Sequence, residues 1–557
     1  MGKNNEKQND KVRNPGRNSK AKGSFKKDSF KRGGKGEPGV SYSKDRAVGG
    51  YSHNDPSWYE PYSGSSRDVA QLSFGNPLGV THRVTNKAES EAFPGMMVMP
   101  FTPIPGISVE GDRESPISTA AQAFYTTVRY AQGVAGNYDP VDLMCYPLMG
   151  DSIYTFWAFA RRIIGTVNMY SSSNRYLARG LVGAMGVDFD DIRANLYDFN
   201  GWLNDLAYQM GSLCMPADFS SYKRHVRMCE NLYTDGESAK AQLYLYVPAY
   251  LWYYDEFADE KYGALKPIEI YGETKGTTRL TFEQLRAIGD QIINSIRHSS
   301  TMMNMAGDIK RAYGDGALMK VPYTELGYMA PIIYDPDQCM EIQNTIVVGR
   351  FGAGRDHPNL IKAMRGTNTL VYDPSFINPL TREGMTSFAG PDEWYLNLRV
   401  DEPTPEQVMR ATRLAVTFDP GVITSEDTDD PYTYTTLATA GSEVVHSVQM
   451  FYFQDSNVKN ELSSIDIESW ALIADDNSAV IHEQAIRTMI MMEKFDFHPI
   501  FYVYNSSTPG TATFEMFGIT GDVQNVTWYG SEFLAKLNRY ALLGEFKSPQ
   551  MGTFFKR

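Results

Sequence analysis

Residues 153–164 read IYTFWAFARRII, and the apolar side chains of this stretch recur at helical spacing. Arg161 and Arg162 fall on the opposite face. The apolar stripe comprises Ile153, Phe156, Trp157, Ala160, Ile163 and Ile164. Such a pattern predicts an amphipathic helix that buries one face against a core. The chain on both sides of this stretch also reads as helical.

Caps and apolar stripes mark the neighbouring helices. Ser115-Pro116 places an N-cap before a proline in the first turn, which predicts a helix to Tyr130 that stops at Gly133. Thr281 and Gln284 form a capping box in front of another helix. The other signals are a start at Asp139-Pro140 and the stripe Phe189, Ile192, Leu196, Phe199, Leu203 and Leu206. The N-terminal half is therefore predicted to be mainly helical.

The sequence changes character from about residue 330, where short β-rich runs are separated by Asp, Pro and Gly turns. The predicted strands are 345–348, 370–372, 395–400, 444–453 and 500–504. The predicted helices among them are 404–416, 481–492 and 531–543. Residues 51–116 contain many Pro and Gly turn signals and are predicted to be an extended segment on a surface. The predicted fold class is α+β.

The length and composition limit the class of protein. The 557 residues are enough for two domains and a tail. The polar start predicts no signal peptide, and no apolar run predicts a membrane-spanning helix. The cysteines contain no CxxC pair, which indicates a reducing compartment rather than a disulfide framework. They are Cys145, Cys214, Cys229 and Cys339.

Methionine is frequent and clustered, at residues 96–99, 302–305 and 489–492. Soft methionine side chains fill irregular gaps in a core. They are also enriched at the centres of subunit interfaces. We expect core packing for each cluster taken singly and an interface for at least one of the three.

The first fifty residues have the opposite charge from the rest of the chain. They contain fourteen Lys and Arg against five Asp and Glu, a net charge of +9, whereas the whole chain carries −13. Residues 51–557 therefore carry −22. Few large apolar side chains occur in residues 1–50, so we expect a disordered basic arm that does not fold alone.

The arm also contains a short repeat, Ser24-Phe25-Lys26-Lys27 followed by Ser29-Phe30-Lys31-Arg32. Cations neutralise phosphates and a phenylalanine ring stacks on an unpaired base, so this spacing favours RNA binding. The alternative is a solubilising or targeting tail. The predicted nucleic-acid-binding residues are Lys3, Lys7, Lys11, Arg13, Arg17, Lys20, Lys22, Phe25, Lys26, Lys27, Phe30, Lys31, Arg32 and Lys35.

No catalytic constellation is predicted, although four patterns come close. Asp475-Asp476 between apolar runs could hold Mg²⁺ as in a polymerase, but the Ser-Gly helix that such an enzyme needs is missing, and a turn is favoured. Asp188, Asp190 and Asp191 suit a helix N-terminus. The third is Cys214, His225 and Cys229, which lack a fourth zinc ligand nearby, so buried thiols are favoured. The fourth is Gly352-Ala353-Gly354-Arg355, which lacks the Gly-Lys-Ser/Thr ending of a phosphate loop. No metal and no cofactor are predicted.

Over nearly its whole length the chain resembles picobirnavirus capsid proteins, close to the human virus type. The resemblance lies in the order and extent of diffuse features after the basic start. These are residues 54–59 (NDPSWY), 105–107 (PGI), 115–121 (SPISTAA), 142–144 (DLM) and the helical region after 186–188 (GVD).

The resemblance implies a shell protein of a double-stranded RNA virus, in the virion and assembled in the host cytoplasm. Symmetric dimers build the icosahedral particle of that family, each subunit having a mostly helical shell domain and a projecting domain. The arm would face inward onto RNA bound without sequence specificity. The domain ranges would be 1–50 for the arm, 51–265 and 481–557 for the shell, and 266–480 for the projection. The N-terminal peptide of that family can be released by maturation cleavage, but no residues in this sequence locate a cleavage site.

Two other functions stay open at the level of sequence. One is a monomeric, non-specific RNA-binding protein with a basic tail. The other is a metal-dependent nucleic-acid enzyme that uses Asp475 and Asp476. For the shell protein, neither a small-molecule substrate nor a transmembrane segment is expected.

Overall fold

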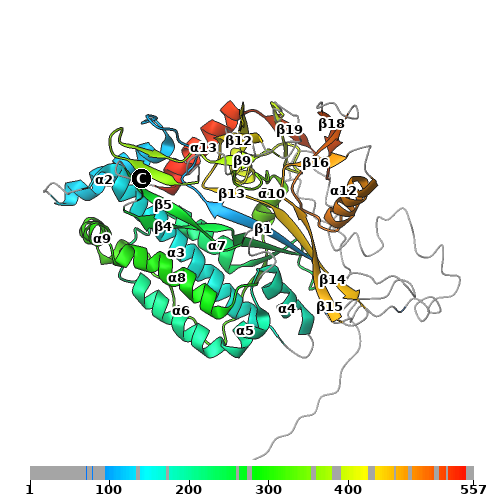
Figure 1. Cartoon of the computed structure of the whole chain (residues 1–557), viewed down its shortest axis with the longest axis horizontal. Helices are drawn as coiled ribbons and strands as arrows, with labels where there is room; N and C mark the ends of the chain where they lie inside the picture. The colour runs from blue at the N-terminus through cyan, green and yellow to red at the C-terminus, as the bar shows by residue number, and fades with distance from the viewer. Residues whose placement is uncertain are drawn as a thin grey trace, which may run out of the picture. The chain divides into compact units, whose positions relative to one another are not determined.

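The computed structural model describes residues 71, 78, 95–132, 138–170, 175–256, 258, 262–271, 279–352, 359–378, 391–424, 433–456, 459–474, 479–506, 514–521 and 525–546. Helices and several sheets alternate along these ranges (Figure 1), so the predicted α+β class is confirmed. No helix within these ranges is both long enough and apolar enough to span a bilayer.

The helix α3, Pro140–Val167, lies at the centre of the helical part and is buried along nearly all of its length. Pro140 stands at its first turn, as the sequence predicts, because a proline there loses no helical hydrogen bond. The prediction that Arg162 faces away from the core is wrong, since its side chain is fully buried. Its guanidinium donates to the carbonyls of Asn231 and Tyr246, at 3.1 and 2.6 Å. These hydrogen bonds offset the loss of water around the charge.

Further helices surround α3, which contacts α2, α6, α7 and α8 (Figure 1). The predicted capping box at Thr281 and the helix start at Pro116 are both confirmed. The predicted stripe from Phe189 to Leu206 is broken into two helices at Asn195, whose side chain bonds back to Asp191. The bounds are α2 Pro116–Gln132, α4 Arg175–Ala184, α5 Phe189–Ala194, α6 Leu196–Met210, α7 Ser220–Glu230, α8 Phe282–Arg297 and α9 Ser300–Tyr313.

A seven-stranded sheet crosses the molecule next to these helices, with the order β15-β14-β1-β3-β2-β6 and β13 also paired with β1 (Figure 1). Its central strand β1 is fully buried, so the prediction of an irregular surface segment is wrong for residues 96–103. A strand covered on both faces reads as a continuous apolar run without alternation. The bounds are β1 Met96–Pro103, β2 Leu232–Thr234, β3 Leu243–Pro248, β6 Ile332–Tyr334, β13 Glu443–Val445, β14 Val448–Ser456 and β15 Lys459–Ile467.

Smaller sheets and helices make up the rest. Strands are found at or close to four of the five predicted positions, but residues 345–348 form only the bridge Val347–Val445. The predicted helices in this half are present as α11, α12 and α13. The remaining bounds are β4 Tyr250–Asp255, β5 Tyr262–Glu269, β7 Ile361–Met364, β8 Thr369–Val371, β9 Ser375–Ile377, β10 Trp394–Asn397, β11 Thr417–Thr424, β12 Thr433–Thr439, β16 Ala471–Ala474, β17 Tyr502–Ser506, β18 Phe514–Ile519, β19 Val526–Tyr529, η3 Asp315–Ala317, α10 Pro336–Gln343, α11 Pro405–Ala411, α12 Ala479–Met492 and α13 Ser531–Glu545.

The last helix, α13, returns to the start of the described chain and packs against α2 (Figure 1). Gly106 has φ +79°, and a Cβ at this position would lie 2.5 Å from Leu542 Cδ1. Arg539 donates to the Glu114 carbonyl at 2.6 Å. Glycine is therefore required at residue 106 both for its backbone conformation and for the close approach of α13.

An aromatic cluster joins β10, β11 and β17. The Trp394 ring lies 5.7 Å from Phe418, 5.4 Å from Trp470 and 5.1 Å from Tyr502, centroid to centroid. The contacts with Trp470 and Tyr502 are edge-to-face, an arrangement that the ring quadrupoles favour. We call these four residues the aromatic cluster.

Candidate functional site

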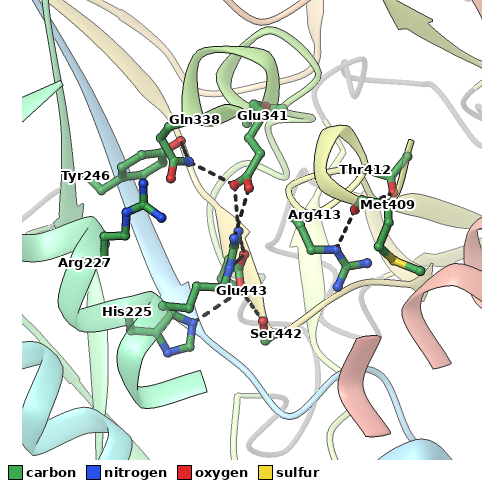
Figure 2. Close-up of polar contacts among 12 residues, drawn as sticks. His225, Arg227, Tyr246, Gln338, Glu341, Met409, Thr412, Arg413, Ser442 and Glu443 are labelled. Carbon is green, nitrogen blue, oxygen red and sulfur yellow. Dashed lines mark hydrogen bonds and ion pairs between the residues drawn. The ribbon is translucent and has the colours of Figure 1, made fainter. Parts of the chain in front are cut away.

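Charged side chains from four separate elements meet inside the protein. Asp151 comes from α3, Arg224 and His225 from α7, Glu341 from α10 and Glu443 from β13. Figure 2 shows Glu341 and His225 on either side of Glu443. All except Arg224 are buried, and the side chain of Arg224 is 18% exposed. We call these five residues the charge network.

Glu443 pairs with both basic residues. Arg224 Nε donates to Glu443 Oε1 at 2.7 Å, and His225 Nε2 lies 3.3 Å from Glu443 Oε2. Ser442 Oγ donates to the same carboxylate. Burial alone would raise the pKa of Glu443, but the Arg224 charge outweighs it and, with His225, holds that pKa below its usual range. Glu443 is therefore ionised at neutral pH.

His225 lies between two carboxylates, with Nδ1 2.6 Å from Asp151 Oδ2 in addition to its contact with Glu443. Burial favours the neutral ring, but the Asp151 charge and the hydrogen bonds to both acids outweigh it and raise the pKa of His225 to about 10. At neutral pH the ring is an imidazolium that donates from both nitrogens.

Arg224 bridges the two glutamates. Its Nη1 and Nη2 donate to Glu341 Oε1 and Oε2 at 3.1 and 2.9 Å, the bidentate geometry that a guanidinium and a carboxylate favour. Gln338 Nε2 donates to Glu341 Oε2 and to Tyr246 Oη, each at 2.9 Å (Figure 2). Burial opposes the charge of Arg224, but Glu341 and Glu443 raise its pKa.

A second group of buried polar residues holds the C-terminal helix. Arg413 donates from Nη2 to Asn538 Oδ1 at 2.8 Å and from Nε to the Met409 carbonyl at 3.1 Å. Its Nη1 lies 3.8 Å from Glu545 Oε1. Burial lowers the pKa of Arg413 and raises that of Glu545, on which the nearby Glu443 charge acts in the same direction. This group connects α13 to the segment after α11.

A cavity of about 370 Å³ opens outside the charge network. Its rim carries the ion pairs Arg227–Asp335 and Arg410–Asp337. The lining balances four cations with four carboxylates and so offers no net charge to a ligand. It consists of Ser220, Lys223, Arg224, Arg227, Asp335, Asp337, Gln338, Glu341, Arg410 and Glu545.

The charge network has a structural role rather than the chemistry of a catalytic site. A His–Asp pair can serve a nucleophile, but a protonated His225 cannot accept a proton at neutral pH. The neighbouring Cys229 thiol is buried, which raises its pKa to about 12. What the network does is connect α3, α7, α10 and β13, which lie far apart in the sequence. Removing one partner of such a buried pair costs about 3–5 kcal/mol.

The residues predicted to bind RNA, from Lys3 to Lys35, lie outside the described part of the chain, as do Asp475 and Asp476. Of the glycine-rich run only Gly352 is described. The predicted position of Asp188, Asp190 and Asp191 at a helix N-terminus is confirmed. Asp188 is the N-cap of α5, and its Oδ1 accepts from the amides of Asp190 and Asp191.

No zinc site is predicted at Cys214, His225 and Cys229, and in the structure these three residues have different surroundings. His225 pairs with carboxylates, Cys229 is buried and Cys214 is half-buried. Across the described residues no cluster of His, Cys, Asp and Glu could hold a metal ion. The prediction of buried thiols is confirmed for Cys229 and wrong for Cys214.

Sequence reasoning missed the charge network. One signal was available, since Asp151 is the only acid between Leu143 and Val167, a largely apolar stretch. An acid in such a place needs a buried partner. The identity of the partner could not be read from the sequence, because Asp151 and Glu443 are almost three hundred residues apart.

Comparison with known proteins gives one consistent result. The sequence model of the family described as "Picobirnavirus, Capsid protein" matches residues 58–504. A capsid protein precursor of human picobirnavirus is 28% identical over 522 residues, covering 90% of this chain and 92% of the relative. The crystal structure of the picobirnavirus capsid matches with a TM-score of 0.73 at 20% identity, covering 90% of this chain and all of the solved chain. The chain belongs to the picobirnavirus capsid protein family.

Proposed function

We propose that this chain assembles into a closed icosahedral shell built from symmetric dimers. The observation that carries the proposal is the family match, which spans most of the body of the chain. The likeness to a solved capsid covers 90% of the chain. We assign residues 51–265 and 481–557 to the shell and 266–480 to the projection. The shell would form in the host cytoplasm and end in the virion.

The basic arm would hold the double-stranded RNA genome inside the shell. Its net charge of +9 stands against −22 for the rest of the chain, so a polyanion is attracted to the arm and repelled by the body. Cations spread over Lys3 to Lys35 have no fixed geometry with which to read base edges, so binding would be independent of sequence.

Sedimentation and negative-stain imaging of the purified full-length protein test the shell. We expect uniform closed particles without any added metal or cofactor. A protein that stays monomeric over a wide range of salt, pH and concentration would instead be an RNA carrier with a basic tail.

Titration of the arm with unrelated RNA sequences at several salt concentrations tests the proposed RNA binding. Each phosphate neutralised on a single strand contributes about −0.7 to the slope of log affinity against log salt, so seven engaged cations give about −5. Replacing Lys26, Lys27, Lys31 and Arg32 by alanine would flatten that slope. Replacing Phe25 and Phe30 would lower affinity with nearly the same slope, because stacking releases no counterions. Affinity that is indifferent to salt would contradict the assignment.

A further inference from the structure

Residues 323–334, which we call the strap, cross the outside of the helical layer with their backbone firmly held. The Thr324 amide donates to Asn204 Oδ1 at 2.8 Å. Asn168 Nδ2 donates to the carbonyls of Leu326 and Tyr328, both at 2.8 Å. These bonds come from α6 and from the residue that follows α3, so helices of the core fix the path of the strap.

Packing holds the strap at two further points. The Arg161 guanidinium lies 4.0 Å from the centre of the Tyr328 ring. At Gly165 a Cβ would stand 2.4 Å from the Ala330 amide nitrogen, so the strap runs directly against the backbone of α3. The strap is therefore a preformed surface whose ordering would cost little on binding.

Five large apolar or aromatic side chains of the strap are exposed to solvent. The exposed fractions are 70% for Tyr323, 48% for Leu326, 62% for Met329, 49% for Ile332 and 42% for Tyr334. No charged residue occurs from 326 to 334. Together these five side chains, which we call the strap stripe, expose roughly 500 Å², more than half of the ~800 Å² that each partner gives to a standard interface.

The strap ends in an edge strand. Strand β6 pairs with β2 on one side and, among the described strands, is the last of the seven-stranded sheet. An apolar edge strand with free backbone groups is a template for pairing unless another chain covers it. The exposed apolar side chains and the edge strand are therefore both features of a surface that binds another protein.

Charge decides between the possible partners. Of the acids near the stripe, Glu325 lies between Tyr323 and Leu326, whereas Asp335 and Asp337 are paired with Arg227 and Arg410. This surface therefore has no excess of cations that would attract RNA. Two copies of an acidic chain approach each other best where little charge is present, and residues 326–334 of the strap carry none.

We propose that the strap stripe and the free edge of β6 form a contact between two copies of this chain. This proposal rests on the proposed self-assembly and assigns one surface of the subunit to it. It excludes water from Met329 and its neighbours and supplies the apolar centre of that interface.

Met329→Asp tests the contact, with Met303→Asp as the matched control, because Met303 is 42% exposed on α9 and lies outside the strap. Full-length proteins are compared by sedimentation, and thermal unfolding confirms that both variants fold. We expect Met329→Asp to lower the yield of particles at least tenfold and Met303→Asp to assemble like the wild type. Assembly of Met329→Asp at the wild-type level would overturn the contact and leave self-assembly intact.

Hydrogen exchange provides a test that needs no variant. Wild-type particles are compared with subunits dissociated from them. We expect the amides of residues 332–334 to exchange at least tenfold more slowly in the particle. Equal exchange in both states would overturn the contact even if Met329→Asp failed to fold. A wild-type protein that never assembles would remove the contact and the proposed shell together.

Discussion

The charge network around Glu443 and the aromatic cluster around Trp394 both join segments that are far apart in the sequence. In the network each charge needs a particular partner, because an unpaired ion in the interior is costly. In the aromatic cluster the rings meet edge to face at 5.1–5.4 Å from Trp394 to its nearest neighbours, and any apolar group of similar size supplies part of the same contact. The network should therefore be sensitive to chemistry and the aromatic cluster to volume.

The largest effect is expected from Arg224→Met, which keeps the length of the side chain and removes its charge. Glu341 then loses its cation, and Glu443 keeps only His225. We expect the free energy of unfolding to fall by about 3–5 kcal/mol in urea denaturation. Arg224→Lys keeps the charge without the bidentate geometry and should lose less. Equal losses in the two variants would show that charge is not what matters here.

The network also makes stability depend on pH. The pKa of His225 is about 10 in the folded protein and near 6.5 in the unfolded chain, so its contribution is complete below pH 6.5 and is lost as pH rises toward 10. One proton gives a slope near 1.4 kcal/mol per pH unit, or about 2 kcal/mol between pH 6.5 and 8. His225→Gln should remove this slope, and urea denaturation at several pH values measures it.

On the acid side the signs are reversed for two other groups. The pKa of Glu443 is lowered, so its contribution is present above its unfolded value and is lost as pH falls. Burial lowers the pKa of His446 to about 4, so folding is weakened as pH drops from 6.5 toward 4. The free energy of unfolding should therefore be greatest between the acid and the alkaline losses. A free energy of unfolding that stays constant from pH 4 to 8 would contradict the pairing described.

A smaller effect is expected from Trp394→Phe in the aromatic cluster. The substitution removes buried ring surface without leaving any charge unpaired, so we expect a loss of about 1–2 kcal/mol. This loss should not change between pH 6.5 and 8, because the four cluster residues carry no charge there. A loss as large as that of Arg224→Met would erase the distinction between the two clusters.

The smallest effect is expected from the exposed ion pair of Arg179 and Asp190. Both Nη atoms of Arg179 bond to Asp190 at 2.7 Å, with side chains that are 46% and 66% exposed. Solvent screens such a pair, so Asp190→Asn should cost less than about 1 kcal/mol. A thermal melt that shifts as far as that of Arg224→Met would show that burial is not the deciding factor.

Features with local causes were predictable from the sequence. The cap at Asp188, the capping box at Thr281 and the proline start at Pro140 depend on residues within one helical turn. Strand β1 was not predictable, because its prolines and methionines resemble a loop and only burial on both faces makes it a strand. The partners of Glu443 were likewise set by tertiary contacts that leave no local pattern.

The central claim is a division of function, in which the arm binds RNA and the body assembles. It is tested most directly by deleting residues 1–45 and measuring the ratio of absorbance at 260 and 280 nm in purified particles. The described body, which contains the charge network and the aromatic cluster, begins beyond the deletion, so particles should form as they do for the full-length chain. Their RNA content should be much lower, because the deletion removes most of the basic residues of the arm. Particles that retain the full RNA content, or a truncated chain that cannot assemble, would contradict this division.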